Sequence, residues 1–175
     1  IEVEVHVSAG LPSLTIVGLA EAAVRESKDR VRSAIINSGY QFPTKRLTIN
    51  LAPADLPKDG SRLDLPIALG ILIATGQLPE NVTDEFEFIG ELALDGHLRP
   101  VTGTLTIAMA CQSAKHQLML PKENAEEAAQ LPEFQVFAAG HLKQVCEHFL
   151  SSKKIDATIS KKAEQSSYYK FDLED

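Results

Sequence analysis

Hydrophobic and polar residues alternate strictly over residues 1–8, which predicts a half-buried strand. A similar but shorter pattern over 13–18 predicts a second strand. From 20 to 38 the apolar residues recur at helical spacing, and Gly39 follows as the expected end of that helix. Residues 46–52 predict a third strand. The first third of the chain therefore reads as two strands, one helix and one further strand.

The stretch 63–75 is apolar on all sides, which predicts a helix buried between two layers, with Asp64 as a candidate N-cap. The pair Asp95-Gly96 between apolar segments predicts a tight hairpin. The other predicted strands are 86–94, 118–121 and 134–138, and the other predicted helices are 103–114, 123–130 and 141–150. Strands alternating with helices predict an α/β fold, a single domain with a mixed β-sheet and packed helices. We place this domain at 1–150 and a polar linker at 151–175.

Composition narrows the class of protein. A chain of 175 residues is long enough for one domain with a proper core. Its formal net charge of −7 argues against a general coat on nucleic acid and against docking on an anionic membrane. The two cysteines, Cys111 and Cys146, both lie in predicted helices, which favours a reducing compartment and a cytoplasmic protein over a disulfide scaffold. The apolar runs are too short to span a bilayer.

Three segments together resemble one bacterial family. Residues 17–43, 46–72 and 88–103 look like the N-terminal domain of the ComM/YifB-type proteins, which are Mg-chelatase-like AAA+ ATPases. The resemblance covers nearly all of 1–150, and the segment 168–175 looks like the run-in to the AAA+ module of that family. It implies a fold similar to the proteolytic domain of Lon and to the C-terminal domain of RadA. That fold carries a left-handed βαβ crossover, whereas the general rule predicts a right-handed one.

The resemblance also implies a function for the full-length protein. ComM-type proteins are understood as hexameric ATPases that act as helicases and drive branch migration when imported DNA is integrated during natural transformation. The expected partners of this chain are its own AAA+ module, neighbouring subunits of a hexamer, and branched or single-stranded DNA, with no membrane. ATP and Mg²⁺ are expected only in the AAA+ module, because none of the ten glycines here is followed by the lysine of a phosphate-binding loop.

A peptidase of the Lon type requires a serine nucleophile and a lysine that accepts its proton. Alignment on the predicted helix 63–75 places Arg62 at the serine position, with Ser61 one residue away. The lysine position falls on Leu105, which cannot accept a proton. We therefore predict that this chain is not an enzyme. A Ser–Lys peptidase remains an alternative that a reaction of Ser61 with a serine-directed probe would revive.

Metal binding has one candidate cluster near the end of the predicted domain. His141, Cys146 and His148 lie close together in the sequence, but Cys146 points away from the helix face that the two histidines share. A second cluster with zinc-ligand spacing does not accompany them. We predict no metal site in this chain.

Basic residues gather in one segment. Residues 20–46 hold six positive and three negative side chains. The candidate DNA-binding residues are Arg25, Lys28, Arg32, Lys45 and Arg46. The first three follow i, i+3, i+7 spacing and are expected to form one stripe on the helix. The alternative is a solvated face held by ion pairs, and the lack of an aromatic residue in the stripe weakens a platform for single strands.

The loop 53–62 is rich in proline and charge, and Lys58, Asp59 and Arg62 are its candidate contact residues. They are candidates for contact with a neighbouring subunit or the ATPase ring, and Lys58 and Arg62 for an extension of the basic stripe. The loop could equally serve only as a connection. The sequence thus predicts a non-catalytic accessory domain of a ComM-like AAA+ DNA helicase that assists ring assembly or DNA handling. The alternative is a protein–protein adaptor without DNA contact.

Overall fold

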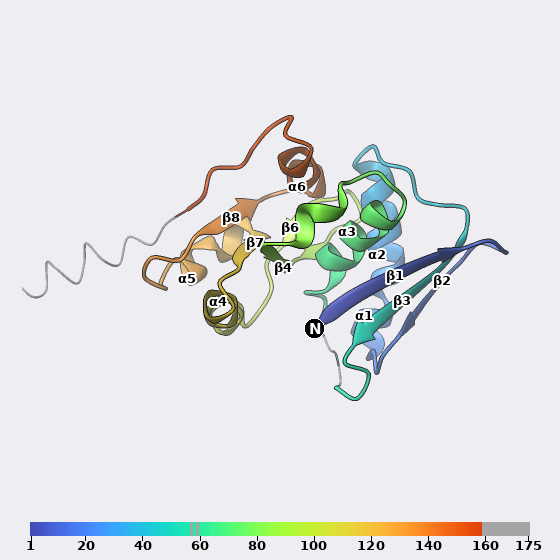
Figure 1. Cartoon of the computed structure of the whole chain (residues 1–175), viewed down its shortest axis with the longest axis horizontal. Coiled ribbons are helices and arrows are strands. Elements are labelled where there is room, and N and C mark those ends of the chain that lie inside the picture. The colour runs from blue at the N-terminus through green and yellow to red at the C-terminus, as the bar shows by residue number, and fades with distance from the viewer. Residues whose placement is uncertain (57, 59, 159–175) are drawn as a thin grey trace, which may run out of the picture.

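A computed structural model of the chain describes residues 1–56, 58 and 60–158 (Figure 1). Its first sheet has the order β1-β3-β2. The three strands are β1 (Glu2–Ser8), β2 (Ser13–Val17) and β3 (Arg46–Ala52). β1 pairs antiparallel and β2 pairs parallel with β3, so this sheet is mixed, as predicted. Alternate residues of β3, namely Leu47, Ile49 and Leu51, are fully buried on one face.

The second sheet is parallel and has the order β4-β7-β8. Its strands are β4 (Phe86–Phe88), β7 (Gln117–Pro121) and β8 (Val136–Ala139). A separate antiparallel hairpin joins β5 (Glu91–Leu92) to β6 (Leu98–Arg99), with the predicted turn between them. The expected strand 86–94 is therefore two strands. The Ile89 N–H donates to the carbonyl of Met119 in the second sheet, whereas the Gly90 N–H donates to the carbonyl of Arg62. The chain therefore leaves the second sheet at Gly90.

The helices follow the predicted order. They are α1 (Ala22–Arg25), α2 (Ser27–Asn37), α3 (Asp64–Ala74), α4 (Thr104–Ser113), α5 (Ala125–Ala128) and α6 (Leu142–Phe149), with 3-10 turns at Glu80–Thr83 and Lys122–Asn124. The expected helix 20–38 is two helices that meet at Glu26. Gly39, at φ 87°, reverses the chain after α2 in the left-handed region where glycine is favoured.

Helix α3 is the centre of the main core. It lies between the β1-β3-β2 sheet and the second sheet (Figure 1), and all its leucines are buried together with Ile67, Ala68 and Ile71. The same core cluster includes residues of β3, α2, β7, β8 and α6. Gly70 lets β1 pack closely on α3, because a Cβ atom there would lie 2.8 Å from Cγ2 of Val5. The predicted helix buried between layers is confirmed.

A smaller core lies between the second sheet and the helices α4 and α5, around Cys111, Leu118 and Val136. After α6 the described chain returns to the second sheet, where Val136 and Thr158 exchange backbone hydrogen bonds of 3.1 and 2.7 Å. The boundary between domain and linker stays a prediction, as does the handedness of the βαβ crossovers. Residues 159–175 of the expected linker lie outside the described residues. Within the described part of the chain, the helices are too short or too polar to cross a bilayer.

Candidate nucleic-acid interface

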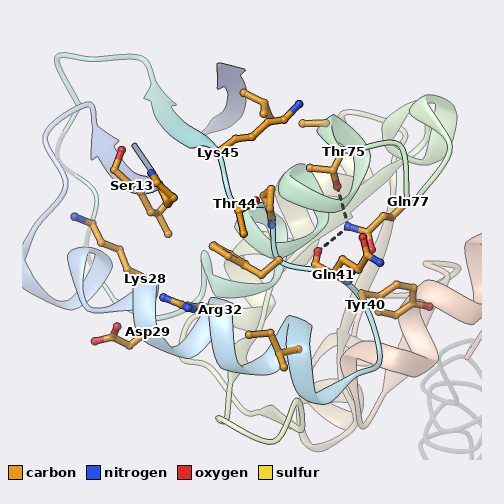
Figure 2. Close-up of a pocket in the computed structure, with 17 residues that line it drawn as sticks. Ser13, Lys28, Asp29, Arg32, Tyr40, Gln41, Thr44, Lys45, Thr75 and Gln77 are labelled. Carbon is orange, nitrogen blue, oxygen red and sulfur yellow. Dashed lines mark hydrogen bonds between the residues drawn. The ribbon is translucent and has the colours of Figure 1, made fainter. Parts of the chain in front are cut away.

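A cleft of about 1020 Å³ opens between α2, the start of β2 and the segment 40–45 that leads to β3 (Figure 2). We call it the basic cleft. The end of α3 forms its remaining wall. Its charged and polar lining residues are Ser13, Lys28, Asp29, Arg32, Tyr40, Gln41, Thr44, Lys45, Thr75 and Gln77. Segments far apart in the sequence therefore build one concave surface.

The helical repeat aims two cations into the basic cleft. Lys28 and Arg32 are four residues apart on α2, so they share one face of the helix. Val31, Ala34 and Ile35 are fully buried on the adjoining side of the helix and anchor α2 to the core, whereas Lys28 is half-buried and Arg32 is exposed. This burial leaves the basic face turned outward. Lys45 lines the same cleft from the segment that leads to β3, and its ammonium points away from Lys28 and Arg32 (Figure 2).

Two aromatic residues join the basic residues in the cleft. Tyr40 and Phe42 follow the turn at Gly39, which brings the chain back beside α2. The guanidinium carbon of Arg32 lies 5.7 Å from the centroid of the Phe42 ring, a cation–π geometry. The expectation that no aromatic residue accompanies the stripe is therefore wrong. Helical spacing alone could not find this pair, because Phe42 lies beyond the end of α2.

The side chain of Gln77 fixes the segment 40–45. Its Oε1 accepts a hydrogen bond of 2.9 Å from the Gln41 N–H, and its Nε2 donates one of 2.8 Å to the Gln41 carbonyl (Figure 2). A further 2.9 Å bond joins Nε2 to the hydroxyl of Thr75. The amide thereby acts on the backbone as a neighbouring strand would. It ties the wall that carries Phe42 and Lys45 to the end of α3.

The cations of the basic cleft form no ion pair with another described residue. Among the described residues, the ion pairs link Arg30 to Glu26 and Asp64, and His97 to Asp95. Lys28, Arg32 and Lys45 take part in none of these pairs. Asp29 is the acidic side chain among the described lining residues. The alternative of a face held by ion pairs thus applies to Arg30, and the cleft keeps a net positive lining.

The other two candidate DNA-binding residues lie outside this lining. Arg25 is exposed at the end of α1, which is separate from α2, and Arg46 is exposed at the start of β3. The expected stripe therefore has Lys28 and Arg32 as members that share one cleft, and Lys45 joins them. Arg62 lines a different groove, beside β1, and its carbonyl accepts a 3.0 Å hydrogen bond from Gly90. Asp59 lies outside the described residues.

Lys58 does not extend the basic stripe, and this expectation is corrected. Its side chain is fully buried, and its ammonium donates to the backbone carbonyls of Gly18, at 2.7 Å, and of Pro53. Its own backbone pairs with the chain at Leu19 and Glu21. A charged group surrounded by carbonyl oxygens is satisfied in place. Lys58 is an internal tether of the loop, so it cannot offer its charge to a partner.

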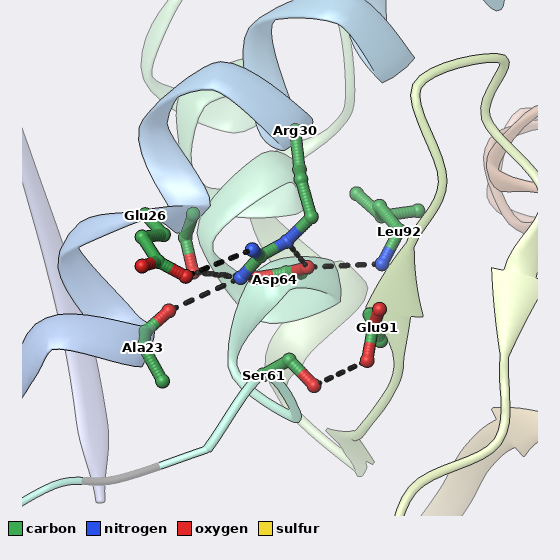
Figure 3. A network of polar contacts seen from close by, with 8 residues as sticks. Ala23, Glu26, Arg30, Ser61, Asp64, Glu91 and Leu92 are labelled. Carbon is green, nitrogen blue, oxygen red and sulfur yellow. Dashed lines mark hydrogen bonds and ion pairs between the residues drawn. The ribbon is translucent and has the colours of Figure 1, made fainter.

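Ser61 has a carboxylate partner. Its hydroxyl donates to Oε2 of Glu91 across 2.5 Å (Figure 3). The Lys58 ammonium is engaged with backbone carbonyls, so these two residues are bound to other groups and not to each other. Leu105, at the expected lysine position, lies in the first turn of α4. The arrangement around Ser61 therefore differs from a serine–lysine pair.

Asp64 is a buried junction and not an N-cap, which corrects the expectation for this residue. Its carboxylate accepts hydrogen bonds from the Ser27 hydroxyl, from Arg30 Nε at 2.8 Å and from the Leu92 N–H at 3.0 Å (Figure 3). The hydrogen bond with Asp64 is the main cause that raises the pKa of Arg30 above its ordinary value. The network joins α2, α3 and β5, and so sets the position of the helix that carries the basic face.

The histidine cluster is dispersed by local structure. His141 caps α6, with Nδ1 accepting a 3.0 Å bond from the Lys143 N–H, whereas His148 Nδ1 accepts one of 2.9 Å from Ile155 N–H. Cys146 is fully buried in the core. In the described part of the chain, histidine, cysteine and acidic side chains do not gather in threes as metal ligands would.

Comparison with known proteins gives four informative matches. Residues 3–124 match the family model described as subunit ChlI of Mg-chelatase. The chain is 52% identical over 153 residues to the YifB protein of Escherichia coli, covering 87% of this chain and 30% of that protein. It is 46% identical over 155 residues to the competence protein ComM of Haemophilus influenzae, covering 89% and 30%. A Lon protease of Chloroflexus aurantiacus is 30% identical over 140 residues, covering 74% and 16%.

Proposed function

Because the chain belongs to the Mg-chelatase ChlI family together with the YifB and ComM proteins, we propose that it is the accessory domain of a ComM-like AAA+ DNA helicase and contacts DNA through the basic cleft. The predicted family and the Lon-like α/β fold are confirmed. The chain spans about 30% of the length of the YifB and ComM proteins. ATP hydrolysis and Mg²⁺ binding belong, in this proposal, to the AAA+ module.

One observation carries the proposal. Three cationic side chains, Lys28, Arg32 and Lys45, line one cleft and lack ion-pair partners among the described residues. Phosphates of nucleic acid are the ligands that such a lining favours, because each contact releases condensed counterions. The resemblance to ComM-type helicases indicates which polyanion to expect, namely DNA. The positive charge of the cleft therefore suits the negatively charged DNA that is expected as the substrate of this family.

The overall charge sets the strength of this contact. The chain carries a formal net charge of −7, so its surface away from the cleft repels DNA. Contact by one domain is expected to be weak and strongly weakened by salt. In a hexamer, six such clefts would raise the apparent affinity through multivalency without any new contact. An accessory role, in which the domain guides DNA while the ring moves it, fits this arrangement.

The test is a binding titration of the 175-residue chain with labelled single-stranded and branched DNA at several salt concentrations. Three phosphate contacts predict a slope of about −2 to −3 in a plot of log K against log salt. The triple variant Lys28→Glu, Arg32→Glu, Lys45→Glu should lose binding. The matched control Arg99→Glu, Lys143→Glu, Lys153→Glu makes the same change of charge at exposed residues away from the cleft and should keep it.

Three results would contradict the proposal. Binding that does not fall with salt would exclude phosphate contacts as its source. An equal loss in both triple variants would mean that net charge, rather than the basic cleft, controls DNA binding. A chain that binds no DNA would instead favour the protein–protein adaptor.

A further inference from the structure

The guanidinium of Arg32 is a supported plane within the basic cleft. The guanidinium carbon lies 5.7 Å from the centroid of the Phe42 ring. Phe42 is half-buried and fixed by the segment that Gln77 clamps, whereas Arg32 is exposed despite this contact. The planar guanidinium therefore has an aromatic neighbour and remains exposed to solvent. Such guanidinium planes stack on unpaired nucleobases.

From this arrangement we propose that the basic cleft binds a single-stranded segment with one base stacked on Arg32, while Lys28 and Lys45 contact the flanking phosphates. The inference rests on the proposed function and adds the form of DNA that the cleft selects. In a duplex the base faces are covered by their neighbours, so a duplex could use only the lysines. A single strand could use the lysines and the plane together.

The size and chemistry of the cleft agree with a base as occupant. Its volume of about 1020 Å³ leaves room for a base together with its sugar and phosphate. Neutral side chains that can bond a base edge, Ser13, Gln41 and Thr44, are exposed in its wall. Asp29 opposes phosphate on the α2 side.

The experiment uses a short thymidine oligonucleotide with a central 2-aminopurine, as a single strand and annealed to its complement. We expect the 175-residue chain to bind the single strand roughly five- to a hundredfold more tightly than the duplex, the range that one stacked base supplies. Binding should also quench the 2-aminopurine fluorescence. Arg32→Lys keeps the charge but removes the plane, so it should lose at least about fivefold in single-strand affinity with an unchanged salt slope.

The control and a second variant keep the test independent of folding. Arg99→Lys makes the same exchange at an exposed residue outside the cleft and should bind as the parent does. Phe42→Leu removes the support of the plane and should weaken quenching. Circular dichroism shows whether each variant is folded, and the exposed position of Arg32 makes Arg32→Lys safe in this respect.

The outcomes separate this inference from the proposed function. Equal affinity for single strand and duplex, with Arg32→Lys like the parent, would overturn base stacking while leaving phosphate contact intact. Equal competition by free thymidine monophosphate and by the oligonucleotide would also overturn it, because the site would then select a nucleotide and not a strand. If no form of DNA binds in a salt-dependent way, both proposals fail.

Discussion

Arg30 on α2 grips both carboxylate oxygens of Asp64 on α3, with Nε 2.8 Å from Oδ2 and Nη2 3.2 Å from Oδ1. The two residues are 34 positions apart, and the pair joins the helix of the basic cleft to the central helix of the core. The carboxylate is fully buried, while the Arg30 side chain is 22% exposed. The pair therefore holds α2 in place from the inside.

We predict that Asp64→Ala lowers the free energy of unfolding by about 3–5 kcal/mol, since it leaves the Arg30 guanidinium partly buried without its partner. Urea denaturation followed by circular dichroism measures the change. Glu26→Ala removes the exposed carboxylate that forms a second ion pair with Arg30, which is 71% exposed and 4.0 Å away, and should cost less than about 1 kcal/mol. Similar losses in both variants would contradict the assigned role of Asp64.

Lys58→Met should destabilise the domain by about 1–3 kcal/mol, because the carbonyls of Gly18 and Pro53 would lose a charged donor inside the fold. Thermal and urea unfolding give this value. Lys143→Met is the matched control, since Lys143 is exposed on α6. A stable Lys58→Met protein with lower DNA affinity would show instead that Lys58 acts at the surface.

Alkaline pH should weaken the fold through Tyr40 and Cys146. Burial raises the pKa of the Cys146 thiol from 9.0 to about 12, and burial followed by the nearby Cys146 raises that of Tyr40 from 10.0 to about 12. Both groups hold protons in the folded state that the unfolded chain releases. Their contribution to stability is therefore complete below about pH 9 and is lost as pH rises toward about 12.

The measurement is the free energy of unfolding between pH 8 and pH 11. Each group that titrates only on unfolding contributes a slope of at most about 1.4 kcal/mol per pH unit. Cys146→Ala should flatten the decline by removing one such group, whatever it does to stability at neutral pH. A decline of the same steepness in Cys146→Ala would mean that other groups cause it.

The sequence predicted the order of elements because β3 alternates strictly and α3 is apolar throughout, and both patterns follow from burial on one or all sides. Periodicity could not foresee the break at Glu26 or the departure from the sheet at Gly90. These depend on hydrogen bonds to distant partners, such as the one from Gly90 to Arg62. The pattern of residues within one segment does not show which distant residues will bond to it.

For the site, helical spacing paired Lys28 with Arg32, and the structure places both in one cleft. The same reasoning gave Lys58 an outward role, because a lysine in a charged loop is usually exposed. Its burial depends on the carbonyls of Gly18 and Pro53, which no sequence pattern brings together. Phe42 was missed because it reaches Arg32 by a reversal of the chain after α2.

Gln77→Ala should loosen the segment 40–45 with a modest loss of stability, about 1–2 kcal/mol, because the bonds it removes lie near the surface. Hydrogen exchange should become faster at the Gln41 amide, and DNA affinity should fall. Gln112→Ala removes a comparable hydrogen bond to the Pro132 carbonyl, away from the cleft. It should leave hydrogen exchange at Gln41 and DNA affinity unchanged. Unaltered exchange at Gln41 in Gln77→Ala would contradict the clamp.

Gln77 bonds only the main-chain N–H and carbonyl of residue 41, so these hydrogen bonds do not depend on the side chain that residue 41 carries. The side chain at position 41 can therefore change without breaking these two hydrogen bonds. A single replacement at 41 therefore changes the chemistry of the cleft wall, while the segment 40–45 stays bound to the end of α3.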